Sequence, residues 1–306
     1  MSSRTLTIPA HAKINWTLYV LGRRADGFHE IRTVMQTITL HDSLTFTQGD
    51  DERLTLTCNE PSIPVNEKNL VLRAALALRE KYGVREGARI HLLKRIPAEA
   101  GLGGGSSDAA AALMGLAHLW KIKTNREELT EIGARLGADV PFFFTGGTAL
   151  GTGLGTEITP LRDVSAEHLL IIKPRAKVST PEAYKALKRP ALTKDGRDII
   201  LSISRAEARI SDSLHEALHN DFEPVIFELY PEIARARERL LEQGARGALL
   251  AGSGASVFGI FESVEAQRRA GEVLEREQGW LVFTSAALAR AAYLDALGEC
   301  AAVLHE

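Results

Sequence analysis

Residues 97–113 read PAEAGLGGGSSDAAAAL, and this stretch indicates what kind of fold the rest of the chain builds. Its glycines allow the main chain to adopt positive φ angles and to come close to a ligand. A strand-like segment at 88–96 precedes the loop, and an alanine-rich helical segment follows it. The first amides of a helix have no partner within it and carry the positive end of its dipole. Strand, glycine turn and helix start together predict an anion site suited to phosphate.

The same loop departs from two common phosphate-binding patterns. Asp108 stands where G-x-x-x-x-G-K-[ST] needs its lysine and hydroxyl, and Ser106 replaces the last glycine of G-x-G-x-x-G. We expect Ser106 or Ser107 to cap the following helix through its hydroxyl. The alternative is a plain flexible turn, but three adjacent glycines cost conformational entropy that such a turn rarely requires.

Composition narrows the classes of protein that fit. The 306 residues are 45% hydrophobic and 25% charged, which is typical of a globular protein with one large or two ordinary domains. A net charge of −2 gives no basic excess for a nucleic-acid partner. We find no signal-peptide core and no apolar run long enough to cross a membrane. Two distant cysteines, Cys58 and Cys300, fit a reduced compartment, so we expect a cytoplasmic protein.

The pattern of predicted elements favours an α+β fold. Residues 5–58 are rich in strand signals, whereas 69–83 and 125–137 have helical spacing, the second with Asn125 as its N-cap. Further along, HLLIIKP predicts a buried strand, and GALLAGSGASVFGIF predicts a strand, a turn and a strand. A closing strand is expected in WLVFTSAAL. Strands and helices are mixed without a strict βαβ rhythm, which argues against a doubly wound sheet.

The glycine loop resembles the phosphate loop of the GHMP kinases, and the resemblance extends in order along nearly the whole chain. The other similar segments are PAHAKINWTLYVLGRRADGFHEIRTVMQTI at 9–38, GADVPFFFTGGTALGTGLGT at 137–156, NDFEPVIFELYPEI at 220–233 and LLAGSGASVFGIF at 249–261. The resemblance implies a two-domain α+β fold, with an N-terminal domain at 1–157 and a C-terminal domain at 158–306. It also implies that ATP, accompanied by Mg²⁺, lies in the cleft between the domains.

The resemblance implies a catalytic pair, Lys13 and Asp139. Phosphoryl transfer needs positioning, charge neutralisation and removal of the hydroxyl proton. Asp139 would act as general base, and Lys13 would orient it and offset charge on the phosphoryl oxygens. Taken alone, Lys13 could equally be a solvated strand lysine, and Asp139 a turn residue before Val140 and Pro141.

The resemblance also implies the binding residues of both substrates. The segment GRRADGFHE at 22–30 points to the branch of the family whose acceptor is 4-diphosphocytidyl-2-C-methyl-D-erythritol, phosphorylated on its 2-hydroxyl. Phe28 and Tyr184 would stack on the two faces of cytosine, and His29 would hydrogen-bond to it. The substrate-binding residues implied are Asn15, Phe28, His29, Thr180 and Tyr184. Those implied for the nucleotide are Asn69, Lys94, Pro97, Ala98, Glu99, Ala100, Gly101, Leu102, Gly103, Gly104, Gly105, Ser106 and Ser107.

Three other functions compete with this interpretation. A GHMP kinase for another small alcohol, such as homoserine or mevalonate, would have no base to stack on Phe28 and Tyr184. A non-catalytic nucleotide-binding module would not need Lys13 and Asp139. The segment HEALH at 215–219 matches the H-E-x-x-H pattern of zinc proteases, but no third ligand is evident. The sequence does not predict an oligomeric state.

Overall fold

The structure is a computed structural model that describes residues 5–188 and 214–304. Two long antiparallel strands, β1 (Thr5–Arg23) and β2 (His29–Gln48), form its central hairpin. The larger sheet has the order β3-β4-β2-β1-β8, and β5 and β6 extend it from the other half of β2. The smaller sheet, β11-β7-β10-β9, is antiparallel throughout. The remaining strands are β3 (Leu54–Cys58), β4 (Ala88–Leu93), β5 (Thr148–Thr152), β6 (Glu157–Pro160), β7 (Leu169–Lys173), β8 (His219–Asn220), β9 (Gly247–Leu250), β10 (Val257–Ile260) and β11 (Leu281–Ser285).

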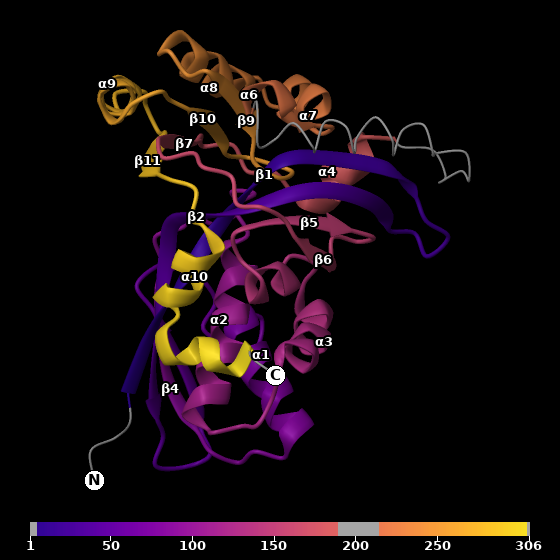
Figure 1. The fold of residues 1–306 in the computed structure, drawn as a ribbon, viewed down its shortest axis with the longest axis vertical. Helices are drawn as coiled ribbons and strands as arrows, with labels where there is room; N and C mark the ends of the chain where they lie inside the picture. Colours follow the sequence, from indigo (N-terminus) through magenta and orange to yellow (C-terminus); the bar gives the residue numbers. More distant parts are fainter. Residues whose placement is uncertain (1–4, 189–213, 305–306) are drawn as a thin grey trace.

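Helices divide between the two sheets, as Figure 1 shows. In the lower half, α1 (Leu70–Tyr82), α2 (Gly104–Leu119) and α3 (Arg126–Leu136) form a layer beside the larger sheet. In the upper half, α8 (Pro231–Glu242) and α9 (Val264–Leu274) cover the smaller sheet. The other helical segments are η1 (Val140–Phe144), α4 (Thr180–Ala186), α6 (Leu214–Ala217), α7 (Glu223–Leu229), α10 (Arg290–Ala296) and η2 (Gly298–Leu304). None of the helices in the described ranges is long and apolar enough to cross a membrane.

Helix α2 is the buried centre of the lower half. Its alanines at 109–112 are almost fully buried, and small side chains allow close packing on the neighbouring elements. Gly115 lies so close to β2 that a Cβ there would stand 2.6 Å from the Phe46 ring. The glycine loop at the start of α2 is therefore held against the larger sheet by tight packing along the helix.

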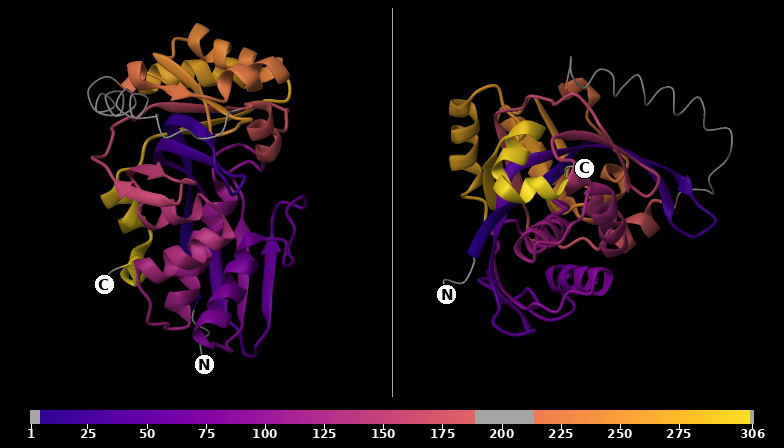
Figure 2. Two further views of the ribbon diagram at one scale, coloured as in Figure 1. Left: turned by 90° about the vertical axis from the view of Figure 1, so that its right-hand side faces the viewer. Right: turned by 60° about the horizontal axis from the view of Figure 1, so that its bottom comes forward.

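The central hairpin joins the two halves. Its inner residues, including Ile14 and Trp16, pack against Leu249 and Phe258 of the smaller sheet. The Trp16 and Phe258 rings meet edge to face with centroids 5.6 Å apart. Figure 2 shows the hairpin running from the lower half into the upper half. The strand that carries Lys13 is thus buried on both sides.

Most predicted elements agree with the structure. The α+β fold is confirmed, and so are the two helices, which begin at their asparagine caps: Asn69 accepts from Val71 N, and Asn125 accepts from Glu128 N. The expected serine cap of α2 is wrong. That helix begins at Gly104 behind Gly103, which has a φ of 69° and gives no side-chain cap. The glycine can adopt the left-handed conformation that starts the helix two residues before the serines.

The C-terminal end of the chain differs from expectation. Strand β11 is not the last element, because α10 and η2 follow it and return to the lower half, beside α2 (Figure 1). Tyr293, Leu297 and Leu304 are buried there in the core of the N-terminal elements. The division at residues 157 and 158 stays a prediction, with residues 290–304 packed on the first half.

Candidate active site

A cavity of about 540 Å³ lies where the two halves meet the central hairpin. Side chains from β1, the glycine loop, the approach to η1, helix α4 and the β9–β10 turn all line it. It brings together Lys13, Asn15, Asn69, Lys94, residues 97–106, Asp139, Thr180 and Tyr184. Ser107 is buried behind this surface, and Phe28 and His29 lie outside the lining. Most of the residues predicted from the sequence are therefore neighbours in one hollow.

Two main-chain hydrogen bonds lock the glycine loop between the two halves. Lys13 N donates to Leu102 O at 2.9 Å, and Ser256 N donates to Ala100 O at 3.1 Å. Gly101 has a φ of 75°, and a Cβ there would lie only 2.0 Å from Ala251 O of the β9–β10 turn. No other residue type fits at this position, because the turn occupies the space of a side chain.

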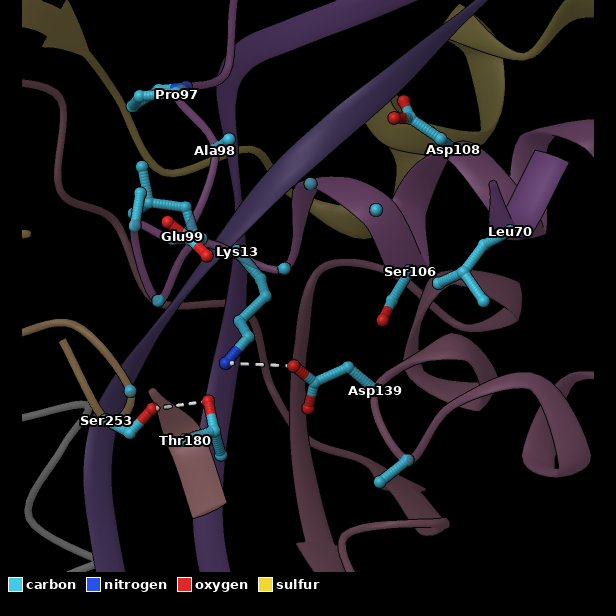
Figure 3. Close-up of a pocket in the computed structure, with 18 of the residues that line it drawn as sticks. Lys13, Leu70, Pro97, Ala98, Glu99, Ser106, Asp108, Asp139, Thr180 and Ser253 are labelled. Carbon is cyan, nitrogen blue, oxygen red and sulfur yellow. Dashed lines mark hydrogen bonds and ion pairs between the residues drawn. The ribbon is translucent and has the colours of Figure 1, made fainter. Parts of the chain in front are cut away.

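Lys13 and Asp139 form an ion pair inside the cavity, with Nζ and Oδ2 3.3 Å apart (Figure 3). Lys13 Nζ also donates to Asn15 Oδ1 at 3.0 Å, and Asn15 Nδ2 donates to Thr33 Oγ1 at 2.7 Å. The lysine side chain is 5% exposed, whereas that of Asp139 is 36% exposed. The buried Lys13 ammonium is therefore fixed by its neighbours, and the Asp139 carboxylate is accessible from the cavity.

Helix α4 and the β9–β10 turn close the opposite side. The Thr180 and Ser253 hydroxyls lie 2.9 Å apart (Figure 3). Asn220, which is buried, holds the turn in place by donating to Gly252 O at 2.7 Å and Leu250 O at 2.9 Å. The strand β8 that carries Asn220 pairs with β1, so the turn and the strand that carries Lys13 share one support.

Three aromatic rings lie together beside the cavity, those of His29, Tyr184 and Phe222. The Tyr184 ring stacks on His29 with centroids 4.9 Å apart and meets Phe222 edge to face at 4.9 Å. Burial, helped by the charge of Asp139, raises the pKa of Tyr184 to about 12. Burial and the nearby charge of Arg23 lower the pKa of His29. Phe28 is 63% exposed at the hairpin tip.

A buried charge cluster, made of Asp42, Lys94 and Asp108, lies beside the glycine loop. Lys94 Nζ lies 2.5 Å from Asp42 Oδ2 and 2.8 Å from Asp108 Oδ2. Burial by itself lowers the pKa of Lys94, but the charges of Asp108 and Asp42 outweigh it and raise that pKa. Burial raises the pKa of Asp108 to about 7; Lys94 opposes that shift, and Asp42 adds to it. Lys94 is therefore held by two carboxylates at the wall of the cavity.

The zinc alternative gains no geometric support. His219 stacks on Tyr19 at 4.2 Å, and its Nε2 lies 2.9 Å from Asp221 Oδ1. The side chains of residues 215 and 216 lie outside the described part of the structure. Within the described part, no three His, Cys, Asp or Glu side chains gather into a metal-binding group.

The sequence alone does not indicate a role for several residues in or behind the wall of the cavity. Asp42 follows a strand segment without any motif, and only the fold brings it to Lys94. Asp108 was visible at the end of the glycine loop, but nothing in the sequence indicated its burial. Phe222 and Ser253 line the cavity from segments that resemble the family, so their segments, though not their roles, were identified.

Comparisons with known proteins agree with this geometry. Residues 69–147 match the family described as "GHMP kinases N terminal domain", and residues 202–279 match "GHMP kinases C terminal". A solved homoserine kinase from Cytophaga hutchinsonii shares the fold, with a TM-score of 0.73 at 20% identity over 94% of this chain and 96% of that one. The fold and the interdomain cavity with its glycine loop define a GHMP kinase.

Relatives of higher sequence identity identify the family within this class. A 4-diphosphocytidyl-2-C-methyl-D-erythritol kinase from Pelotomaculum thermopropionicum is 43% identical over 86% of this chain and 92% of its own length. Another, from Geobacter metallireducens, is 41% identical over 93% of this chain and 99% of its own length. A crystal structure of 4-(cytidine 5'-diphospho)-2C-methyl-D-erythritol kinase aligns with a TM-score of 0.74 at 34% identity, covering 92% and 99% of the two chains. The chain belongs to the family of 4-diphosphocytidyl-2-C-methyl-D-erythritol kinases.

Proposed function

We propose that this enzyme transfers the γ-phosphoryl group of ATP to the 2-hydroxyl of 4-diphosphocytidyl-2-C-methyl-D-erythritol, and that Asp139 is the general base. The observation that carries the proposal is the Lys13–Asp139 pair, 3.3 Å apart, in the same cavity as the glycine loop. Phosphoryl transfer depends on positioning and charge neutralisation, and both are provided at this place. The step belongs to a biosynthetic route to isoprenoid precursors, and we propose that it takes place in the cytoplasm.

In the proposed reaction, the acceptor hydroxyl oxygen forms a bond to the γ-phosphorus while the bond to the bridging oxygen of ADP breaks. The hydroxyl proton passes to Asp139, whose carboxylate is the exposed member of the pair. Lys13 holds that carboxylate in place and offsets negative charge on the phosphoryl oxygens. General base help of this kind is typically worth about 10²–10⁴-fold in rate.

The nucleotide would lie along residues 97–107, with main-chain amides at the start of α2 directed at its phosphates. Its purine end would lie near Asn69 and Lys94, which line the same cavity. Ser107 is buried and its main-chain N donates to Gly103 O, so we propose that its part in the site is to hold the start of α2 in place. Because the described residues make no metal-binding group of their own, Mg²⁺ would enter with ATP, coordinated by phosphate oxygens and water.

The acceptor would lie on the opposite side of Asp139. Asn15 would hold the polyol, and Thr180, beside Ser253, would contact the acceptor at the rim of α4. Phe28 and Tyr184 would enclose the cytosine ring. Since the His29 ring rests against Tyr184, it must swing aside to admit the base, which places it at the edge of the base as a hydrogen-bond partner.

The test is release of ADP, measured with a coupled assay over a panel of alcohols. We expect turnover with 4-diphosphocytidyl-2-C-methyl-D-erythritol and background rates with homoserine and mevalonate. Turnover with one of those alcohols instead would overturn the acceptor assignment. Nucleotide binding without turnover on any alcohol would overturn the assignment of catalysis to this cavity.

A further inference from the structure

The Asp42–Lys94–Asp108 cluster has a property that the proposed phosphoryl transfer does not use. The two carboxylates of the cluster differ in the hydrogen bonds that they accept. Asp42 is fully buried and accepts hydrogen bonds from Lys94 Nζ, Arg95 N and Ile96 N. Among the described residues, Asp108 accepts from Lys94 through Oδ2, and its buried Oδ1 has no hydrogen-bond partner. An unpaired buried carboxylate oxygen is costly, and a proton on it removes most of the cost.

The surroundings of Asp108 explain why no protein group satisfies Oδ1. Asp108 lies one turn into α2, beyond the free amides of the helix start, since Ser107 N already donates to Gly103 O. Its side chain is 5% exposed, yet it lines the nucleotide cavity. Figure 3 shows Ser106 pointing toward Asp139 and Asp108 pointing away from it, to the other end of the cavity. A nucleotide in the cavity would therefore lie close to the charge of the Asp108 side chain, while Oδ1 itself stays buried.

The charge balance around Asp108 gives the direction of its titration. The charged groups that act on it are Lys94, from the end of β4, and Asp42, from β2. With all three ionised, the cluster carries one net negative charge in a wall that must receive an anionic nucleotide. The other charged groups lining the cavity are Lys13, Lys68, Glu99 and Asp139. An arriving triphosphate adds negative charge and so favours the protonated form of Asp108.

We propose that nucleotide binding takes up one proton at Asp108, because the anionic nucleotide enters beside a cluster that is net negative when Asp108 is ionised. Protonation makes the cluster neutral, so it no longer repels the phosphates. Lys94 Nζ lies 3.3 Å from the position that a Cβ of Gly104 would take. With one carboxylate of the cluster neutral, its positive charge is offset less and attracts phosphates at the glycine loop more strongly. Asp108 is in this account a positioning residue for the nucleotide. The proposal rests on the nucleotide site of the proposed function, although it does not depend on the identity of the acceptor.

The pKa of Asp108, about 7 in the free protein, is consistent with such a change. A nucleotide that binds the protonated form better raises this pKa further, so binding takes up a proton at any pH between the free and bound values. Above pH 7 the affinity should therefore fall by about tenfold per pH unit, the slope expected for one linked proton. Below pH 7 this contribution to the slope disappears, because Asp108 is then already protonated.

Isothermal titration calorimetry of ADP with Mg²⁺ tests this on the whole protein between pH 7.5 and 9. The terminal phosphate, with a second pKa of about 6, is already ionised in this range. Titrations in two buffers with different enthalpies of ionisation give the number of protons taken up. We expect close to one at pH 7.5 to 8 for the unmodified protein. A value of zero would overturn the proposal without the need for any variant.

Asp108→Asn gives the second arm, because asparagine keeps the shape of the side chain and carries no charge at any pH. We expect it to bind ADP at pH 8.5 at least as tightly as the unmodified protein, with no proton uptake and a flat pH profile. Glu131→Gln removes one exposed carboxylate far from the cavity and should keep the full slope. An unchanged slope in Asp108→Asn would overturn the assignment to Asp108. Because no acceptor is present, failure here is distinguishable from failure of the proposed phosphoryl transfer.

Discussion

The two ends of the cavity are built by different means. At the nucleotide end, the main chain of the glycine loop is fixed by close contacts: Gly101 touches the β9–β10 turn, and Gly103 lies against the Lys13 side chain. At the acceptor end, the surface consists of side chains, with Phe28 exposed at the hairpin tip and His29 resting on Tyr184. The backbone contacts at the first end leave room for few substitutions, whereas a single substitution at the second end can change the surface that a ligand would meet.

This difference separates what the class shares from what distinguishes its members. A phosphate cradle made of main-chain amides depends on backbone shape, so it needs particular glycines but few particular side chains. Selection between acceptors depends on side chains that stack on or hydrogen-bond to the variable part of the substrate. The Lys13–Asp139 pair lies between the two ends. Substitutions at the pair, in the glycine loop and at the hairpin tip should therefore change different measured quantities.

The largest effect is expected at the pair itself. Asp139→Asn should lower kcat by at least about a hundredfold, because the amide cannot take the hydroxyl proton. The KM for ATP should change little, since the glycine loop is unaltered. Steady-state kinetics checks both values, and Asp295→Asn, an exposed carboxylate on α10, provides the control. Near-normal turnover in a folded Asp139→Asn protein would remove the general base from the mechanism.

A substitution in the glycine loop should damage nucleotide binding and stability together. Gly101→Ala places a Cβ 2.0 Å from Ala251 O at a φ of 75°, so the backbone must shift. Overpacking of this kind typically costs about 1–3 kcal/mol of the free energy of unfolding. We expect a lower Tm and weaker ADP binding, measured by thermal denaturation and calorimetry.

The matched control for this change is Gly105→Ala in the first turn of α2. A Cβ there meets only Leu70 Cδ1 at an ordinary 3.7 Å. Alanine is favoured over glycine in helices by up to about 1 kcal/mol, so the Tm should stay the same or rise. If both alanine variants behave alike, the contrast between a locked loop and a permissive helix start is wrong.

At the acceptor end the effect should be smaller and confined to one substrate. Phe28→Ala removes a stacking ring, which is typically worth about 1–3 kcal/mol per base. We expect the KM for the acceptor to rise by about tenfold, with the KM for ATP and the Tm unchanged, because Phe28 is 63% exposed. Phe28→Tyr keeps the ring and should retain the acceptor KM. A loss of stability in Phe28→Ala would mean that the ring supports the hairpin rather than the substrate.

The locked end was also the more predictable one. Consecutive glycines before an alanine-rich helix indicated a phosphate loop, and the kinase family that this loop resembles is confirmed. The apolar run HLLIIKP likewise predicted the buried strand β7, and GALLAGSGASVFGIF predicted the strands β9 and β10 with a turn between them. These features depend on local backbone requirements, which particular residue types indicate directly in the sequence.

Features that depend on distant residues could not be predicted. The cap of α2 was misplaced because a positive φ at Gly103 starts the helix before the serines. The helices α10 and η2 return to the first half, where Tyr293 and Leu297 are buried. No local sequence pattern predicts these contacts. The pairing of Asp42 with Lys94 joins residues 52 positions apart in the chain. The roles of the individual binding residues remain predictions that the variants above can test.

The smallest effect concerns the stability cost of the nucleotide end. The pKa of Asp108 is raised from 3.8 to about 7 on folding, so the folded protein binds more protons than the unfolded chain between these values. Its contribution to stability is therefore fully present below pH 3.8 and is lost as the pH rises through about 7. Asp108→Asn should remove this loss, and its Tm should exceed that of the unmodified protein by about 2–4 °C at pH 8 for each kcal/mol recovered. The advantage should shrink toward pH 4, which thermal denaturation at several pH values can follow. An advantage that does not change with pH would mean that Asp108 keeps its charge state on folding, and the nucleotide end would then carry no stored electrostatic cost.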